Sequence, residues 1–279
     1  MAWKAKYCHT HRVRVVVTVP IVDNRLVSAT PPTPDWQRWL DRWEAQQGWY
    51  MPDREARFAV MIDTVEALCG PAPDVVDLGS GPGSLSRRIL DRLPQARVTA
   101  IDMDPVLLAI GRNALGDQGG RLQWLDADLR SRWSARAEGR VDAAVSTTAL
   151  HWLQPNALAA LYRHLGTVLA PGGVFVNGDR MEFPPDLPRL AEAARTIRDR
   201  AEQADAGSAE TWEEWWAAVE QDPGLASEVA ERSRRHHEHP DHEHAADLAE
   251  HIEGLRQAGF TEVGTIWQQL ADRVLVAIR

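Results

Sequence analysis

The 279-residue sequence has few cysteines and no long apolar run, and these absences exclude several classes of protein. Cys8 and Cys69 lie far apart, so we expect two unpaired thiols in a reducing, cytoplasmic setting rather than a disulfide framework. No stretch of about 18 apolar residues is present, which argues against a membrane-spanning helix. A net charge of −9 leaves no broad cationic field for a nucleic-acid backbone. The composition therefore predicts a protein that acts on neither membranes nor nucleic acid.

The first residues, 1–34, carry no pattern of a folded core. They include an apolar run at residues 13–22, but Arg14 and Pro20 interrupt it, which argues against a secretory signal peptide. We expect an N-terminal extension, either loosely ordered or forming a strand with a partner, that ends in a stiff, proline-rich stretch.

The most informative motif is a glycine-rich turn that follows a short apolar strand at residues 75–78. Gly79, Gly81 and Gly83 come next, and glycine accepts positive φ and lets the main chain approach a ligand closely. Asp77 places a carboxylate at the end of the strand, where the ammonium group of a ligand could sit. Taken alone, such a turn also fits any tight strand-to-helix connection.

A second strand, residues 97–102, ends in another carboxylate. Asp102 follows Gly79 by about 20 residues, the spacing at which a carboxylate holds both hydroxyls of a ribose. The dinucleotide fingerprint also requires a third glycine, and Ser84 stands at that position. A nucleoside ligand is therefore indicated, and an NAD(P)-dependent oxidoreductase remains only as an alternative.

The acidic residues and glycines of this region resemble the first two motifs of class I S-adenosylmethionine (SAM) methyltransferases. Residues 122–129 are similar to the third strand and turn of that family, and Pro171-Gly172-Gly173 is similar to its turn into the fifth strand. Leu150-His151-Trp152 resembles the turn of the small-molecule branch typified by trans-aconitate methyltransferases. No Asn-Pro-Pro-Tyr-like tetrapeptide follows the strand at residues 141–146, which argues against the branches that methylate nucleic acids or glutamine.

The resemblance implies SAM as the cofactor and assigns roles around it. Asp128 would bind the adenine amino group, Leu129 would cover the ring, and Arg54 or Arg57 would meet the carboxylate of the donor. Thr147 stands where several relatives have asparagine. The donor-binding residues implied in this way are Tyr50, Asp77, Gly79, Gly81, Gly83, Asp102, Met103, Asp128, Leu129 and Thr147.

The same resemblance implies methyl transfer to a small organic acceptor, which we expect to be a natural-product intermediate. His151 is the candidate base, because its ordinary pKa suits proton transfer near neutral pH; a purely orienting role is the alternative. Candidate acceptor-binding residues are Trp152, Asp179, Arg180 and Trp215. A non-catalytic SAM-binding protein is a further alternative.

The fold that the alternating strand and helix signals predict is α/β: a Rossmann-like, doubly wound, mostly parallel sheet. The resemblance adds seven strands and an antiparallel C-terminal hairpin, which we place at residues 261–269 and 273–278. We expect core helices at residues 84–92, 105–114 and 155–169. The expected parts of the chain are residues 1–34 (extension), 35–70 (helical cap), 71–182 (SAM-binding core), 183–243 (helical acceptor lid) and 244–279 (last helix and hairpin).

Two further patterns lie outside the core motifs. Trp36, Trp39 and Trp43 recur at helical spacing, a stripe that packs on its own domain or on a dimer partner, or else lines a pocket. Residues 234–244 are rich in histidine, arginine and carboxylates, and we interpret them as a hydrated loop rather than a functional metal site. Because the tryptophan stripe can pack on a dimer partner, a homodimer is one expected assembly.

Overall fold

The computed structural model describes residues 32–51, 53–133, 141–204, 210–238 and 246–279, except for the side chains of residues 202–204 and 236–238. Residues 32–279 form one compact unit. Among the described residues, no helix has both the length and the apolar character needed to cross a membrane. Cys69 is a free thiol whose pKa is raised to about 11 by burial, and Cys8 lies outside the described residues.

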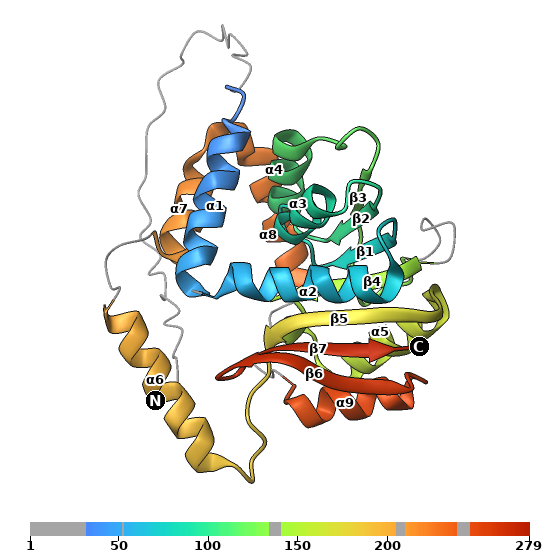
Figure 1. Cartoon of the computed structure of the whole chain (residues 1–279). Helices are drawn as coiled ribbons and strands as arrows, with labels where there is room; N and C mark the ends of the chain where they lie inside the picture. The colour runs from blue at the N-terminus through green and yellow to red at the C-terminus, as the bar shows by residue number, and fades with distance from the viewer. Residues whose placement is uncertain (1–31, 52, 134–140, 205–209, 239–245) are drawn as a thin grey trace, which may run out of the picture. The chain divides into compact units, whose positions relative to one another are not determined.

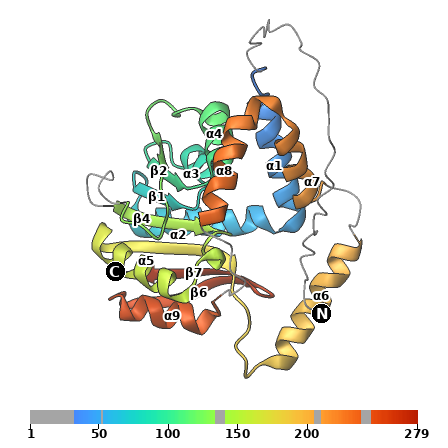
Figure 2. The ribbon, with the colours of Figure 1, turned by 180° about the vertical axis from the view of Figure 1, so that it is seen from behind.

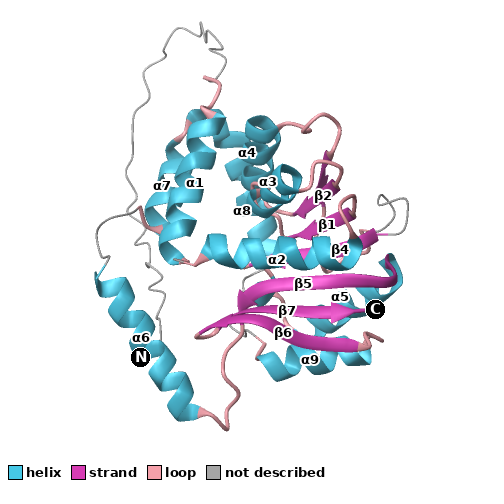
Figure 3. Cartoon of the chain, in the orientation of Figure 1, coloured by secondary structure: helices cyan, strands magenta, loops and turns pink. Residues whose placement is uncertain are grey.

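The centre of the structure is a seven-stranded sheet in the order β3-β2-β1-β4-β5-β7-β6 (Figure 1, Figure 3). The first five strands pair in parallel, and β7 runs antiparallel to both β5 and β6. This arrangement confirms the predicted fold class. The strands are β1 (Asp74–Leu78), β2 (Arg97–Asp102), β3 (Leu122–Asp126), β4 (Val141–Thr147), β5 (Leu169–Arg180), β6 (Glu262–Gln269) and β7 (Asp272–Ile278).

Helices cover both faces of the sheet, as a parallel sheet of buried apolar strands requires. One apolar cluster joins one face of the sheet to α2 and α3 (Figure 1). Helix α4 packs on β2 and β3. A second cluster joins the opposite face to α5 and α9. The three expected core helices are α3 (Ser84–Arg92), α4 (Pro105–Leu115) and α5 (Pro155–Val168), and their ends lie within one residue of the prediction. Two further helices on the sheet are α2 (Arg54–Cys69) and α9 (Leu248–Gln257).

Local chemistry explains where these helices begin. The Asp35 carboxylate accepts the N–H of Arg38 and caps α1 (Trp36–Tyr50). The Asp104 carboxylate caps α4 through the N–H groups of Val106 and Leu107, and proline at the first position of that helix lacks an N–H to satisfy. Side-chain acceptors therefore fix the starts of α1 and α4.

The helices outside the core form a third apolar cluster. The tryptophan stripe of α1 packs on α4 and on α7 (Trp212–Gln221), so the stripe contacts its own domain. The Trp39 and Trp43 rings lie 5.7 and 5.1 Å from that of Trp215, centroid to centroid. The segment 183–243 thus packs partly as an extension of the core. It contains α6 (Pro188–Ala204), α7 and α8 (Ala226–Glu238), as Figure 2 shows from behind.

Two sequence expectations need correction at the level of secondary structure. Residues 234–238 belong to α8 and are not a loop. In the run that begins at Ala226, oppositely charged side chains stand one helical turn apart, as Glu231 and Arg235 do, and such pairs stabilise a helix. β5 begins at Leu169, so the Pro-Gly-Gly turn lies inside the strand, beside a register shift in its pairing with β4.

Candidate functional site

The candidate site lies where the chain order of the sheet reverses. β1 and β4 are neighbours, although β2 and β3 separate them in the sequence. Ligands of doubly wound sheets bind beyond the carboxyl ends of the strands at such a point. The predicted site residues at strand ends therefore converge: Asp77, Asp102, Thr147, Asp179 and Arg180.

The glycine turn needs its glycines for conformation and for space. Gly79, Gly81 and Gly83 have φ of 67°, 54° and 88°, values that favour glycine. A Cβ on Gly79 would lie 2.4 Å from the Cβ of Ala149, the residue just before the Leu-His-Trp turn. The turn and the end of β4 are therefore packed together closely.

Asp77 is fully buried beneath this turn and does not face outward. One carboxylate oxygen accepts the hydroxyl of Ser86 in α3 at 2.6 Å, and the other oxygen has no partner among the described residues. Burial raises the pKa of Asp77 to about 7. Contact with a ligand's ammonium stays a prediction; in this structure the carboxylate accepts a hydrogen bond from α3.

We expect the raised pKa of Asp77 to appear as a pH dependence of stability. The pKa of Asp77 is about 7 in the native state, against an ordinary 3.8. Between these pH values the native state holds a proton that the unfolded state has released, so the free energy of unfolding falls as pH rises. The loss is at most about 1.4 kcal/mol per pH unit. Asp77→Asn should therefore gain stability relative to wild type from pH 5 to pH 7, measured by denaturant unfolding. A constant difference across this range would contradict the assignment.

Four carboxylates lie at the ends of β2 and β3, and three of them are neutralised by arginine. Asp104 pairs with Arg232 at 2.8 Å, Asp126 with Arg235 at 2.7 Å, and Asp128 with Arg130 at 2.7 Å. The exception is Asp102, whose oxygens accept backbone N–H groups of the glycine turn and of the start of α4, at 2.7 and 2.8 Å.

Within the described chain, Asp102 has no arginine or lysine within ion-pairing distance, and burial raises its pKa to about 6. The Asp102 carboxylate is thus aligned by the main chain and lacks a cationic partner. Such a group is well placed to accept two hydroxyl groups of a ligand. The Asp128 carboxylate, in contrast, already pairs with Arg130, so it would have to bind adenine and Arg130 at the same time.

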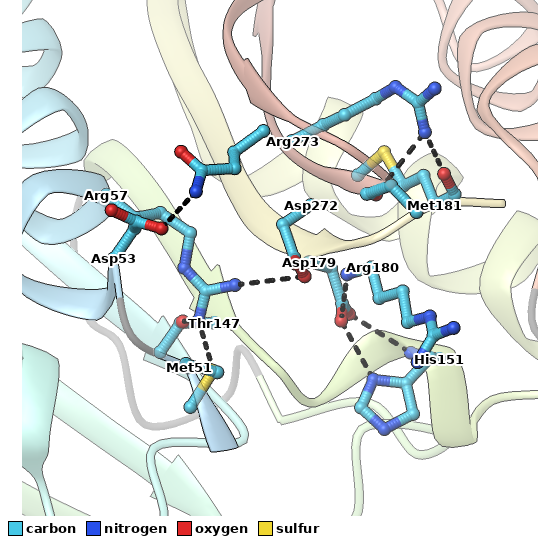
Figure 4. A network of polar contacts seen from close by, with 12 residues as sticks. Met51, Asp53, Arg57, Thr147, His151, Asp179, Arg180, Met181, Asp272 and Arg273 are labelled. Carbon is cyan, nitrogen blue, oxygen red and sulfur yellow. Dashed lines mark hydrogen bonds and ion pairs between the residues drawn. The ribbon is translucent and has the colours of Figure 1, made fainter. Parts of the chain in front are cut away.

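His151 and Asp179 form a hydrogen-bonded pair at the ends of β4 and β5 (Figure 4). The Nδ1 atom of His151 lies 2.8 Å from one Asp179 oxygen, and the other oxygen accepts the N–H groups of Leu150 and His151. Burial alone would lower the pKa of His151, but the charge and the hydrogen bond of Asp179 together outweigh it and raise the pKa; the pKa of Asp179 is lowered in turn. Because Nδ1 is engaged, Nε2 is the ring nitrogen placed to accept a proton.

The structure distinguishes the two candidate arginines of α2. Arg54 forms an ion pair with Glu44 at 2.6 Å. Arg57 is only 2% exposed, donates to the Thr147 hydroxyl at 3.1 Å, and makes a long ion pair of 4.0 Å with Asp272. Its Nε has no partner among the described residues, and burial lowers its pKa. Figure 4 shows this guanidinium beside the end of β4. A buried cation with incomplete pairing favours an anionic ligand.

The remaining predicted residues fall into different surroundings. Trp152 is 53% exposed with its ring 4.8 Å from that of His151, so it remains available to an acceptor. Trp215 has no exposed surface and lies inside the tryptophan cluster, where its evident role is packing.

Two predicted donor residues make contacts within the protein. The Tyr50 hydroxyl accepts the N–H of Trp212, and Leu129 packs partly buried against the core. The histidine-rich residues 236–244 lie outside the side chains that the structure describes.

Comparisons with known proteins agree with this geometry. Residues 75–173 match the model of a family described as a methyltransferase domain. Trans-aconitate 2-methyltransferase of Azoarcus sp. (strain BH72) is 35% identical over 137 residues, 48% of this chain and 49% of that protein. The enzyme of that name from Escherichia coli O139:H28 is 37% identical over 100 residues, 36% of either chain. The matches thus span about half the length of these relatives or less.

Solved structures share the fold at low sequence identity. Human N-acetylserotonin methyltransferase in complex with SAM has a TM-score of 0.52 and 14% identity, covering 87% of this chain and 55% of its own. An O-methyltransferase family protein from Burkholderia thailandensis has a TM-score of 0.52 and 18% identity, covering 87% and 69%. At such identities the likeness shows the fold alone.

Proposed function

We propose that this chain, whose residues 75–173 belong to a methyltransferase domain family, is a SAM-dependent methyltransferase that acts on a small organic acceptor. The observation that carries the proposal is the site itself, in which three features meet at the carboxyl ends of the strands: a glycine turn, a His–Asp pair, and the Asp102 carboxylate, which has no arginine or lysine partner among the described residues. The relatives' acceptor is a small organic acid by name. For this chain we propose a small acceptor from a natural-product pathway, in a cytoplasmic enzyme.

The residues present fit such a donor. A Cβ on Gly81 would meet nothing nearer than 3.8 Å, so the main chain there has room beside it, and Asp102 presents oxygens that backbone N–H groups hold in place for two hydroxyl groups. Arg57 offers a buried, incompletely paired guanidinium for a carboxylate. The donor, when bound, supplies a methyl group activated by its positive sulfur.

The protein's own contribution is alignment, exclusion of water and removal of a proton. His151 takes the acceptor proton at Nε2 as the methyl group is transferred, while Asp179 holds the ring through Nδ1 and balances the imidazolium charge. Exposed Trp152 offers an aromatic face next to this base. Arg180 donates its N–H to Asp179, so the main chain after β5 also fixes the pair.

Calorimetric titration with S-adenosylhomocysteine tests the donor assignment, with NAD as the control ligand. We expect micromolar binding of S-adenosylhomocysteine and none of NAD. A screen of small acids, phenols and amines with methyl-labelled SAM then identifies the acceptor. A folded protein that binds NAD but not S-adenosylhomocysteine would overturn the proposal.

A pair of neighbouring variants tests the role of Arg57. We expect Arg57→Met to lower affinity for S-adenosylhomocysteine at least about tenfold, since charged hydrogen bonds contribute on the order of 1.5 to 3 kcal/mol each. Binding of methylthioadenosine, which lacks the carboxylate, should not change. The control is Arg54→Met, because Glu44 already engages that arginine. Equal losses for both ligands would contradict the carboxylate assignment.

A further inference from the structure

Helix α8 is attached to the edge of the sheet by two arginines. Arg235 donates from one guanidinium nitrogen to the Met103 carbonyl at 2.6 Å and pairs with both oxygens of Asp126, at 2.7 and 3.0 Å. Arg232 pairs with Asp104 at 2.8 Å. Bidentate pairing of a guanidinium with a carboxylate is among the strongest and most directional polar contacts.

The attachment points lie on both sides of Asp102. Met103 and Asp104 follow it directly in the chain, and Asp126 is its partner in the pairing of β2 with β3. The α8 helix therefore bridges the end of β2 and the end of β3. If Asp102 binds a ribose, this bridge lies at the ribose and adenine end of the site.

The same helix is also tied to the tryptophan cluster. The guanidinium of Arg232 lies 3.6 Å from the centroid of the Trp216 ring, which belongs to α7. Arg235 is supported by Glu231 one turn earlier, at 2.7 Å. Both arginines are mostly buried, with exposed side-chain fractions of 23% and 22%. The Arg232–Asp104 pair, in which Asp104 is 12% exposed, is therefore less screened by salt than a surface pair, whereas the Asp126 carboxylate is 41% exposed.

We propose that α8 forms the outer wall of the donor subsite, and that Arg235 is a positioning residue which holds the wall in place and limits donor and product dissociation. The inference rests on the proposed function, because it takes Asp102 as the ribose ligand. Arg235 acts through Met103 and Asp126 rather than on the reacting atoms. Breaking its contacts should release α8 from β3 while Arg232 still links α8 to the start of α4.

The test compares two arginines by stopped-flow dissociation of S-adenosylhomocysteine. We expect Arg235→Gln to release the ligand roughly tenfold faster than wild type, an effect of the size of one lost charged contact. The matched control is Arg195→Gln, since Arg195 is exposed on α6 and pairs with Glu192 of the same helix. Equal dissociation rates for the two variants would overturn the inference.

A second variant approaches the contact from the sheet and guards against misfolding of α8. Asp126→Asn should raise the dissociation rate by a similar factor, and the double variant with Arg235→Gln should add little, as expected for two sides of one interaction. Full additivity would overturn the inference. If wild-type protein does not bind S-adenosylhomocysteine at all, the proposed function fails instead, so the two failures are distinguishable.

Discussion

Asp102→Ala lowers the affinity for S-adenosylhomocysteine by about 10²-fold or more, the largest loss we expect from a single change at the donor site. Two hydrogen bonds to a charged carboxylate contribute on the order of 1.5 to 3 kcal/mol each. Of the four carboxylates at this edge, Asp102 is the one that lacks a described arginine partner, so its oxygens can serve a ligand. Titration calorimetry measures the loss directly.

The variant also removes two backbone contacts, and the controls must separate this effect. Asp102 aligns the N–H groups of Gly81 and Asp104, so alanine could loosen the glycine turn. Asp102→Asn retains one acceptor oxygen and should bind more strongly than alanine but more weakly than wild type. Asp74→Asn, which alters a carboxylate at the opposite end of β1, should not change affinity. A folded Asp102→Ala protein with wild-type affinity would exclude the ribose assignment.

Much of this fold could be predicted because its signals are local. β1 and β2 read as buried apolar runs, and the helices after them begin at a glycine turn and at a capping aspartate. Side chains at strand ends must gather at one edge of a parallel sheet, so the convergence of Asp102, Thr147 and His151 followed from topology.

The interactions that the sequence did not reveal are between distant residues. Arg235 lies 109 residues from Asp126 and 132 from Met103, so no local pattern links them. The helix that carries Arg235 was obscured by its histidine-rich end, although the Glu231–Arg235 spacing was a usable signal. Likewise, burial of Asp77 against Ser86 depends on how α3 packs, which strand position alone does not determine.

The role of Asp179 also depends on tertiary contacts that the sequence does not reveal. From the sequence, Asp179 is a candidate acceptor ligand because it follows the expected fifth strand. The structure places its carboxylate on Nδ1 of His151 and on the N–H groups of residues 150, 151 and 180. With its hydrogen-bonding capacity used in this way, Asp179 is better placed to orient the base than to bind the acceptor directly.

His151→Ala should lower the rate of methyl transfer by about 10²-fold or more, since positioned general bases contribute 10² to 10⁴. Affinity for S-adenosylhomocysteine should be unchanged, which separates catalysis from donor binding. The measurement is kcat/KM with the acceptor found in the screen. His164→Gln, a change on α5 where that ring contacts Trp133, serves as a histidine control. A loss smaller than about tenfold would favour the orienting role over the base role.

The pH profile separates a base from an orienting residue more sharply. A base must be neutral, so kcat/KM should rise with pH through the pKa of His151, which Asp179 raises above its ordinary 6.5. Asp179→Asn removes the negative charge, so the rise should move to lower pH even as the maximal rate falls. Loss of the adjacent negative charge must lower the pKa of His151, so an unchanged profile in Asp179→Asn would show that His151 is not the titrating base.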